Sequence, residues 1–375
     1  MSCVHSRVWP TLLFLAVMFA FGAQNLQAQI THIVGTCMTG TTFTTIQKAL
    51  NTPPFPNTVE VCPGTYKEQV HITRPVTLEG ISSNNNDKAI ILPPSGGLVV
   101  NAGEAFDSLG VAAQVFVQVA TSVNLSNLII DGTGNRISNV EDYIVGILYE
   151  DTSGTVNGVT TRNQEGNGNG VGIWLEGGTF LPPSVTVEHC TIHGYDHTGI
   201  LTEASFPGVV GSLVTATINQ NFVYGHSTKP TPASALHLFY GSTVTATNNY
   251  VGIGPSGYGV FLAGAAGNVS GNTIVGGTDS VGVEVAIDGA ISINSNNFSA
   301  GLGGVIWTTR TQSTAVQNNL IVRAKYGLEF NCNSANGLAY SNTIIETDTG
   351  VDRIPAGTAS ANTYFGVATE ATSCP

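Results

Sequence analysis

The sequence predicts an all-β solenoid, and three observations support this fold class. Only 10% of the 375 residues are charged and 45 are glycine, a profile that favours short strands joined by turns over helical bundles. A motif of strand, polar position and short apolar run recurs from about residue 123 onward. A second motif, glycine followed by alternating apolar residues, comes after almost every copy of the first.

Residues 1–28 have the features of a signal peptide. Thr11 to Phe21 form an apolar stretch that is too short to span a bilayer, and a weakly basic start precedes it. We expect cleavage after Ala28, with Gly22 as the alternative position. No later stretch reaches transmembrane length. The sequence therefore predicts a secreted or periplasmic protein without a membrane span.

A short helix is predicted next, over residues 44–51. Thr44 followed three residues later by Gln47 matches a capping box. Ile46, Ala49 and Leu50 then fall on one helical face. We expect this helix to cover the first coil of the solenoid, because a stack of coils otherwise exposes unpaired strand edges. Export permits disulfides, so we pair Cys37 with Cys62, which would pin the helix in place.

The stretch NTVEVCPGTYKEQVHITRPVTLEG, residues 57–80, reads as the first full coil. Pro63-Gly64 supplies a turn between two alternating runs. The apolar residues of these runs are expected to point inward: Val59, Val61, Val70, Ile72, Val76 and Leu78.

The first motif recurs nine times from residue 123, at intervals of 22 to 32 residues. Aligned, its copies place these residues in one column: Asn127, Gly158, Cys190, Asn221, Asn249, Asn272, Asn297, Asn319 and Asn342. An all-strand repeat of this length predicts stacked coils that share one core. Buried asparagines in such a stack can bond to one another. We therefore expect Asn297 to point inward, which argues against glycosylation of the Asn-Phe-Ser sequence there.

The solenoid is expected to span residues 29–352, and a non-repeating tail, residues 353–375, to cover its other end. We pair Cys332 with Cys374, which would tie this tail down. Cys190 is left over, and we interpret it as a small buried apolar residue.

The opening segment TTIQKALNTPPFPNTVEVCPGTYKEQVHITRPVTLEG resembles that of the pectin-lyase-like superfamily. The resemblance, through this opening and the later repeats, covers nearly the whole chain after residue 28. It implies a single-stranded right-handed parallel β-helix with a short N-terminal capping helix. It implies no single activity, because the superfamily includes lyases, hydrolases, esterases, epimerases and members without known catalysis. The catalytic motifs of its pectin methylesterases, polygalacturonases, pectate lyases and alginate epimerases are absent from the sequence.

The second motif defines two outward columns on successive coils. One column contains Trp174, His237 and Phe261, and the other contains Glu150, Glu176 and Glu203. Stacked carboxylates raise one another's pKa and suit general acid catalysis or Ca²⁺ binding. We therefore take Glu150, Glu176, Glu203 and His237 as candidate catalytic residues. Trp174, His197 and Phe261 are candidates for binding sugar rings, and the long turns near 131–146 and 162–170 would wall the same groove.

Three functions remain open: a polysaccharide-binding β-helix, a polysaccharide-degrading enzyme, or a structural repeat in a surface assembly. Among enzymes, a glycosidase is favoured over a lyase, which would need a Lys or Arg base in the groove. The net charge of −12 without a basic patch excludes nucleic acid as a partner. We expect a monomer that engages polysaccharide or cell-surface glycan, with Ca²⁺ as the one cofactor the carboxylates suggest.

Overall fold

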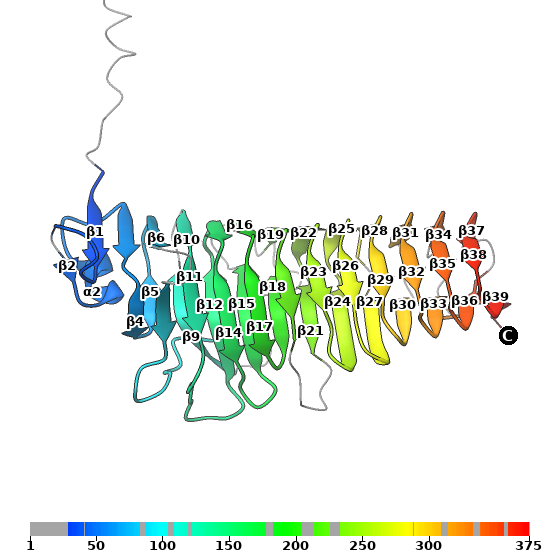
Figure 1. The fold of residues 1–375 in the computed structure, drawn as a ribbon, viewed down its shortest axis with the longest axis horizontal. Helices are drawn as coiled ribbons and strands as arrows, with labels where there is room; N and C mark the ends of the chain where they lie inside the picture. The colour runs from blue at the N-terminus through cyan, green and yellow to red at the C-terminus, as the bar shows by residue number, and fades with distance from the viewer. Residues whose placement is uncertain are drawn as a thin grey trace, which may run out of the picture.

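The computed structural model describes residues 29–40, 42–82, 88–103, 109–118, 122–177, 183–204, 213–225, 233–287, 289–308, 314–332, 338–355 and 359–374. The predicted signal peptide lies outside the described residues. The described chain is all-β apart from one short helix, α2 (Ile46–Asn51), and its strands form three long sheets. Figure 1 shows the coils stacked in chain order along one axis, with α2 near one end and the C-terminus at the other.

Sheet A has 14 strands. In stacking order they are β2 (Thr42–Phe43), β1 (Thr31–Val34), β3 (Thr58–Val61), β6 (Val76–Gly80), β10 (Val123–Ser126), β13 (Gly154–Asn157), β16 (Ser184–Glu188), β19 (Val214–Asn219), β22 (Ser242–Thr247), β25 (Ala266–Ser270), β28 (Ile291–Asn294), β31 (Ala315–Gln317), β34 (Leu338–Tyr340) and β37 (Ala359–Ser360).

Sheet B has 12 strands. They are β4 (Gly64–Lys67), β7 (Ala89–Leu92), β11 (Leu128–Asp131), β14 (Thr160–Gln164), β17 (Thr191–Tyr195), β20 (Phe222–Tyr224), β23 (Tyr250–Gly252), β26 (Thr273–Val275), β29 (Asn297–Ser299), β32 (Leu320–Val322), β35 (Thr343–Ile345) and β38 (Thr363–Phe365).

Sheet C has 13 strands, of which β8 (Ala102–Gly103) pairs antiparallel with β9. The others are β5 (Val70–Ile72), β9 (Gly110–Gln118), β12 (Tyr143–Glu150), β15 (Gly170–Gly177), β18 (Thr198–Ala204), β21 (Ser234–Phe239), β24 (Ser256–Ala263), β27 (Asp279–Ile287), β30 (Gly303–Trp307), β33 (Tyr326–Glu329), β36 (Thr349–Ile354) and β39 (Thr369–Ser373).

Each repeated coil passes from sheet A to sheet B to sheet C, and its strands pair in parallel with those of the next coil. The bend from sheet A to sheet B is made by a single residue in the left-handed backbone region, such as His189 (φ 53°) or Asn248 (φ 56°). Short polar residues and glycine tolerate this region best. The residue after the bend then points into the core, which fixes the position of the asparagine ladder.

The predicted asparagine ladder is confirmed over most of its length. It runs through Cys190, Asn221, Asn249, Asn272, Asn296, Asn319, Asn342 and Asn362. From Asn221 to Asn342, each asparagine also donates its side-chain amide to the next one, as Asn221 Nδ2 does to Asn249 Oδ1 at 3.0 Å. These bonds satisfy amides that would otherwise be costly to bury.

The predicted asparagine column is wrong at three positions. Asn127 (φ 54°) and Gly158 (φ 63°) are the bend residues themselves, and the inward positions belong to Leu128 and Val159. Asn297 is exposed, because its neighbour Asn296 occupies the ladder. Burial therefore does not exclude glycosylation at Asn297.

The core consists of aliphatic columns inside the coils. In sheet A one column reads Val156, Val187, Ile218, Ala246, Val269, Ile293, Val316 and Ala339, each fully buried. The inward residues predicted for the first coil are buried as well. Trp307 is buried in the same core and stacks on Phe330, with ring centroids 4.3 Å apart. Because every coil contributes to one continuous core, no coil buries its apolar residues alone.

The N-terminal helix covers the first coil with Ile46, Ala49 and Leu50, as predicted. Its N-cap is Thr45, whose hydroxyl accepts a hydrogen bond from Lys48 N, so the predicted Thr44–Gln47 capping box is wrong. The Gln47 side chain bonds instead to the backbone of His71 on β5. The Glu68 carboxylate accepts bonds from the backbone N–H groups of Ile46 and Gln47, at 2.9 Å each.

Both predicted disulfides are present, and they join Cys37 to Cys62 and Cys332 to Cys374. Cys190 is a free, buried cysteine, as predicted. The C-terminal segment differs from the non-repeating tail that we expected. Strands β37, β38 and β39 form a further coil that pairs with the preceding coil in all three sheets. The solenoid therefore continues past residue 352, and its last coil covers the inward residues of the coil before it.

Candidate functional site

The outer face of sheet C carries the predicted functional columns. On β12, Ile147 and Tyr149 enter the core, while Leu148 and Glu150 alternate with them and face outward. Strand pairing aligns Leu148 with Trp174 on β15, and the column continues through Leu201, His237, Phe261, Glu284, Ile306 and Glu329. The register of this column agrees with the alignment of the sequence repeats.

The glutamate column is formed by three adjacent coils. Glu150 on β12 pairs with Glu176 on β15, which pairs with Glu203 on β18. Neighbouring strands lie about 4.8 Å apart, so the three carboxyl groups start from adjacent rungs. Glu176 and Glu203 are only 3% and 6% exposed, whereas Glu150 is half-buried. Two of the three carboxyl groups are therefore almost withdrawn from solvent.

The pKa of Glu150 is raised above its ordinary value. Burial is the main cause, and the carboxylate of Asp151 adds to it, while a hydrogen bond from Gln118 Nε2 at 3.1 Å opposes both. Glu150 thus keeps its proton to higher pH than a solvated glutamate does, a property that a general acid requires.

An apolar cluster lies beside the glutamates on the same outer face. Phe116, Leu148, Trp174 and Leu201 are at most 3% exposed and pack together, separately from the core inside the coils. The Trp174 ring is therefore not an open platform for a sugar, which differs from the role predicted for it. The described residues give its indole Nε1 no hydrogen-bond partner.

Aromatic and imidazole rings form a continuous path from this cluster toward the later coils. The centroid of Tyr143 lies 5.2 Å from that of Trp174 and 5.8 Å from that of His197. His197 lies 6.3 Å from His237, which in turn lies 4.8 Å from Phe261. The fold thus brings His197 next to the predicted column that contains Trp174, His237 and Phe261.

Both histidines of this path have lowered pKa values. Burial lowers the pKa of His237 to about 3, and the nearby His197 contributes. Burial also lowers the pKa of His197, although the carboxylate of Asp196 opposes the shift. Both imidazoles are therefore neutral at pH 7. His237 is a poor general base under these conditions, and its Nε2 has no hydrogen-bond partner among the described residues.

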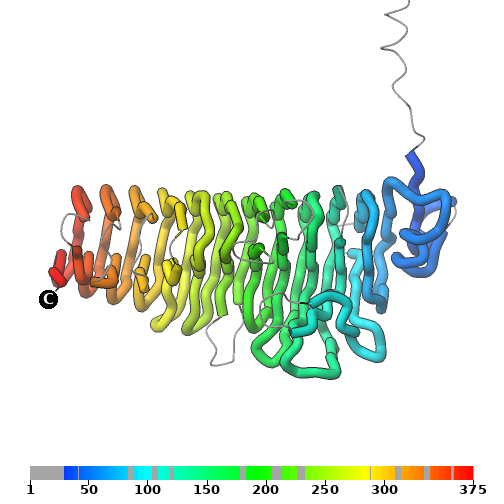
Figure 2. Tube along the Cα trace, turned by 180° about the vertical axis from the view of Figure 1, so that it is seen from behind, coloured from blue at the N-terminus to red at the C-terminus, as the bar shows by residue number. Residues whose placement is uncertain are grey.

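The turns from sheet B to sheet C border this face. The turns that precede β12 and β15, residues 132–142 and 165–169, extend from one side of the helix in both views (Figures 1 and 2). Asp196, which is 3% exposed, holds the second turn by accepting bonds from the N–H groups of Gly166, Gly168 and Gly170. Asn169 Nδ2 donates to Glu141 O at 2.6 Å, which links the two turns.

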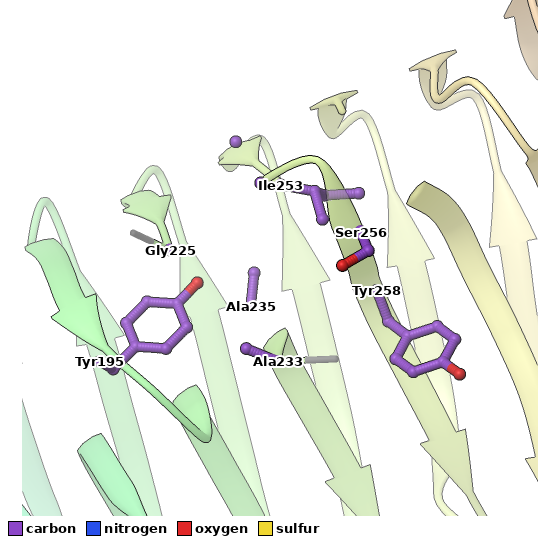
Figure 3. A pocket seen from close by; sticks show the side chains of 9 residues that line it. Tyr195, Gly225, Ala233, Ala235, Ile253, Ser256 and Tyr258 are labelled. Carbon is purple, nitrogen blue, oxygen red and sulfur yellow. The ribbon is translucent and has the colours of Figure 1, made fainter. Parts of the chain in front are cut away.

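A small hollow lies at a later corner between sheets B and C. Figure 3 shows Tyr195 and Tyr258 on its opposite sides, with Ala233 and Ala235 between them. Its cavity volume is only about 10 Å³. Ligand pockets usually measure about 300–1,000 Å³, so the hollow alone is too small for a sugar chain.

The described residues do not support a metal centre or a membrane-spanning helix. Within the ranges given above, no group of three His, Cys, Asp or Glu side chains is placed to hold a metal ion. The same ranges contain no helix that is long and apolar enough to cross a membrane. The suggested Ca²⁺ has no described ligand cluster.

Sequence reasoning missed Tyr143, Phe239 and Asp196. Tyr143 lies at the start of β12, outside the repeated motif, and no periodic signal marks it. Phe239 follows Glu203 in the same outward column, on the next coil. Its ring meets that of His237 edge-on, with centroids 5.4 Å apart. Asp196 belongs to no repeated motif, and its glycine partners lie 26 to 30 residues earlier in the chain. The GNGNG run at 166–170 was the one available signal for it.

Comparisons with known proteins show similarity in structure. No family model matches the chain, and no curated protein matches it in sequence. The catalytic domain of a GH87 α-1,3-glucanase in complex with nigerose aligns with a TM-score of 0.57 and 11% identity, over 92% of this chain and 68% of that one. A GH136 lacto-N-biosidase from Eubacterium ramulus aligns with a TM-score of 0.55 and 11% identity, over 91% and 67%.

PfbA, a surface adhesin of Streptococcus pneumoniae, aligns with a TM-score of 0.51 and 13% identity, over 84% of this chain and 85% of that one. At these identities the similarity concerns the fold alone. Together with the three parallel sheets, it establishes that the chain is a right-handed parallel β-helix.

Proposed function

We propose that this protein binds polysaccharide across the outer face of sheet C, around β18, β21 and β24. The observation that carries the proposal is the unpartnered Nε2 of His237 beside the rings of His197 and Phe261. A polar atom without a partner among the described residues is unusual. The His237 ring is partly exposed, so a small rotation of the ring would let a sugar hydroxyl bond to Nε2. The neighbouring rings offer apolar surface to the C–H groups of a sugar.

The electrostatics favour a neutral glycan over a polyanion. Both imidazoles are uncharged at pH 7, and Glu150, Glu176 and Glu203 lie on the neighbouring positions of the same face. The chain as a whole carries a net charge of −12. Anionic sugars would therefore be repelled. The names of the structural neighbours, a glucanase bound to nigerose and a lacto-N-biosidase, agree with a carbohydrate ligand.

Affinity electrophoresis against a panel of neutral and uronic polysaccharides tests the proposal. Wild-type protein should be retarded by a neutral polysaccharide. His237→Ala and Phe261→Ala should each weaken the retardation, by roughly tenfold in affinity for a residue at the centre of a binding site. Phe365→Ala is the matched control, because this exposed ring lies on the terminal coil. Equal retardation of the wild type and both sheet C variants, with unchanged melting temperatures, would reject the site.

Glycoside hydrolysis is the second candidate function, and the glutamate column favours it. Adjacent rungs place two carboxyl groups at about the separation that retaining glycosidases use, roughly 5 Å, and the raised pKa of Glu150 suits a general acid. Release of reducing ends, measured with and without Ca²⁺, should be abolished by Glu176→Gln or Glu203→Gln and unaffected by Glu370→Gln. Turnover that survives both substitutions would exclude the column, and a rise in unsaturated-uronate absorbance would instead indicate a lyase.

We also propose that the protein is exported, which agrees with its two disulfides. The predicted signal peptide remains a prediction. Mass spectrometry of the protein recovered from its native host should find an N-terminus at Gln29, whereas a retained Met1 would contradict cleavage. Expected monomeric behaviour likewise remains to be measured.

A further inference from the structure

Exposed aromatic rings gather on the outer face of sheet B, away from the sheet C site. Strand pairing places Phe222 on β20 beside Tyr250 on β23, and their side chains are 43% and 40% exposed. The adjacent outward column contributes Tyr224 and, one coil earlier, His193. We name Phe222, Tyr224, Tyr250 and His193 the aromatic patch. Most large aromatic residues of a solenoid are buried, so a group of them on one surface requires an explanation.

The four rings contact one another as a single surface. Phe222 and Tyr250 are stacked, with centroids 4.7 Å apart and planes inclined by 16°. Tyr224 meets Phe222 edge-on at 5.0 Å and stacks on His193 at 4.9 Å. The rings therefore restrain one another, so little side-chain entropy remains to be lost when a ligand binds.

The patch has an open side toward the later coils. The next residue in the Phe222–Tyr250 column is Thr273, which is too short to continue the stack. In the adjacent column, Tyr224 is followed by Gly252. A Cβ atom at Gly252 would lie only 3.1 Å from Tyr224 Cβ and 3.9 Å from Tyr250 Cε1. Because glycine stands there, space remains beside the Tyr250 ring.

The open side leads into the hollow shown in Figure 3. Gly252 ends β23 and lines that hollow, as does Gly225, which directly follows Tyr224. The hollow therefore borders the ends of β20 and β23, next to Tyr224 and Tyr250. The hollow is too small for a sugar chain but adds depth next to the rings.

The surroundings of the patch are electrically balanced. The charged residues of the Tyr224 column, Asp131 and Arg162, pair with each other at 2.7 Å. Burial and the neighbouring Arg162 lower the pKa of His193, so its ring is neutral at pH 7. The residues that flank the stacked rings in their own column, Thr191 and Thr273, are uncharged hydroxyl donors and acceptors. Flat rings bordered by hydroxyl groups without net charge match a neutral sugar, whose ring has an apolar face and a polar rim.

We propose that the aromatic patch is a second carbohydrate-binding surface, which takes a neutral polysaccharide by stacking a sugar ring on Tyr250 beside Phe222. The proposal rests on the proposed function for the nature of the ligand but not for its location. Two surfaces on different faces of one β-helix would hold a long polymer at two points and raise its overall affinity.

Affinity electrophoresis in hydroxyethyl cellulose and in laminarin tests the patch. We expect Phe222→Ala/Tyr250→Ala to lose on the order of tenfold or more in affinity for the polymer that retards the wild type. Tyr250→Phe, which keeps the ring, should retain binding. Leu338→Ala is the matched control, because this residue is 50% exposed on sheet A. Melting temperatures of all variants establish that they are folded.

The outcomes separate this proposal from the sheet C site. If His237→Ala/Phe261→Ala binds as the wild type while Phe222→Ala/Tyr250→Ala does not, the patch stands and the sheet C proposal fails. The patch is rejected if its double variant binds both polymers as the wild type does, or if neither polymer retards the wild type. It is also rejected if sedimentation shows that the patch variant only converts a dimer into a monomer, because the rings would then be an interface between two copies of the chain.

Discussion

At the scale of single residues, the asparagine ladder shows how a buried polar group stabilises a repeat. Asn249 donates its side-chain amide to Ile218 O and to Asn272 Oδ1, and its own Oδ1 accepts two bonds from Asn221. Every amide is thus paired with the coils on both sides. The ladder fixes the register of the coils because a slip by one residue would leave these groups unpaired.

Replacement of one ladder member should therefore be costly. Asn249→Ala leaves the backbone N–H of Asn221 without its acceptor, and we expect it to lower the free energy of unfolding by about 3 kcal/mol. Urea unfolding followed by circular dichroism measures the change. Asn297→Ala, at an exposed site one residue from the ladder, should change stability by less than about 0.5 kcal/mol. Similar losses in both variants would show that the ladder is not what stabilises the coils.

The raised pKa of Glu150 predicts a pH-dependent destabilisation. In the unfolded chain the pKa of Glu150 is about 4.3. Below that pH the carboxyl group is protonated in both the folded and the unfolded state, so it does not change the free energy of unfolding. As the pH rises from there through the higher folded-state pKa, ionisation is easier in the unfolded chain, and stability falls. Glu150→Gln should thus raise the melting temperature at pH 7 and have little effect near pH 4. An equal shift at both pH values, or a loss at pH 7, would contradict the assignment.

The residue scale also shows what the sequence could and could not predict. Alternation and repeat spacing placed Glu176 above Glu150 and Trp174 beside Leu148 correctly, because the outward columns follow directly from strand register. The asparagine column slipped by one residue at Asn127, because the bend residue there is itself an asparagine and the inward residue is Leu128. It slipped at Asn297 because two asparagines follow one another, and Asn296 is the one that points inward. The burial of Trp174 could not be predicted, since it depends on contacts between coils outside the repeated motif.

At the scale of elements, the turn between β14 and β15 is held by one side chain from the following coil. Asp196 accepts hydrogen bonds from three glycine N–H groups of this turn, the shortest being 2.7 Å from Gly170 N. Glycine permits this close approach of backbone to carboxylate. The sequence predicted long turns on this side of the solenoid. It did not predict the hydrogen bonds between Asp196 and these glycines, because the partners come from different coils.

Loss of the Asp196 carboxylate should loosen the turn between β14 and β15 without unfolding the solenoid. In Asp196→Ala, amide hydrogen exchange of Gly166, Gly168 and Gly170 should accelerate, while the ladder amide of Asn272 keeps its wild-type rate. Mass spectrometry of peptides that cover 165–170 measures the change. Asp279→Ala, at an exposed position on β27, serves as the control. If the turn exchanges at the wild-type rate in Asp196→Ala, the carboxylate does not hold it.

At the scale of the whole molecule, the β-helix is a one-dimensional stack, so its ends are the weakest parts. The first coil is covered by α2 and joined to the preceding segment by the Cys37–Cys62 disulfide. The last coil has exposed residues along β39 and carries the second disulfide, which closes a span of 42 residues. In the chain-entropy model, a loop of that size contributes about 4 kcal/mol.

Removal of the second disulfide should therefore fray one end only. In Cys332→Ser/Cys374→Ser, residues 359–373 should exchange amide hydrogens faster, while β1 and β3 keep their protection. Cys37→Ser/Cys62→Ser should show the reverse pattern. A uniform loss of protection along the chain in either variant would contradict the one-dimensional description.

The proposed function requires a neutral polysaccharide to bind across the outer face of sheet C. Hydrogen–deuterium exchange in the presence of oligosaccharides cut from the polymer that retards the protein most strongly tests it directly. We expect added protection in β18 (Thr198–Ala204), β21 (Ser234–Phe239) and β24 (Ser256–Ala263), and we expect this protection to disappear in His237→Ala. Added protection confined to β20 and β23, or equal protection in His237→Ala, would contradict the proposed function.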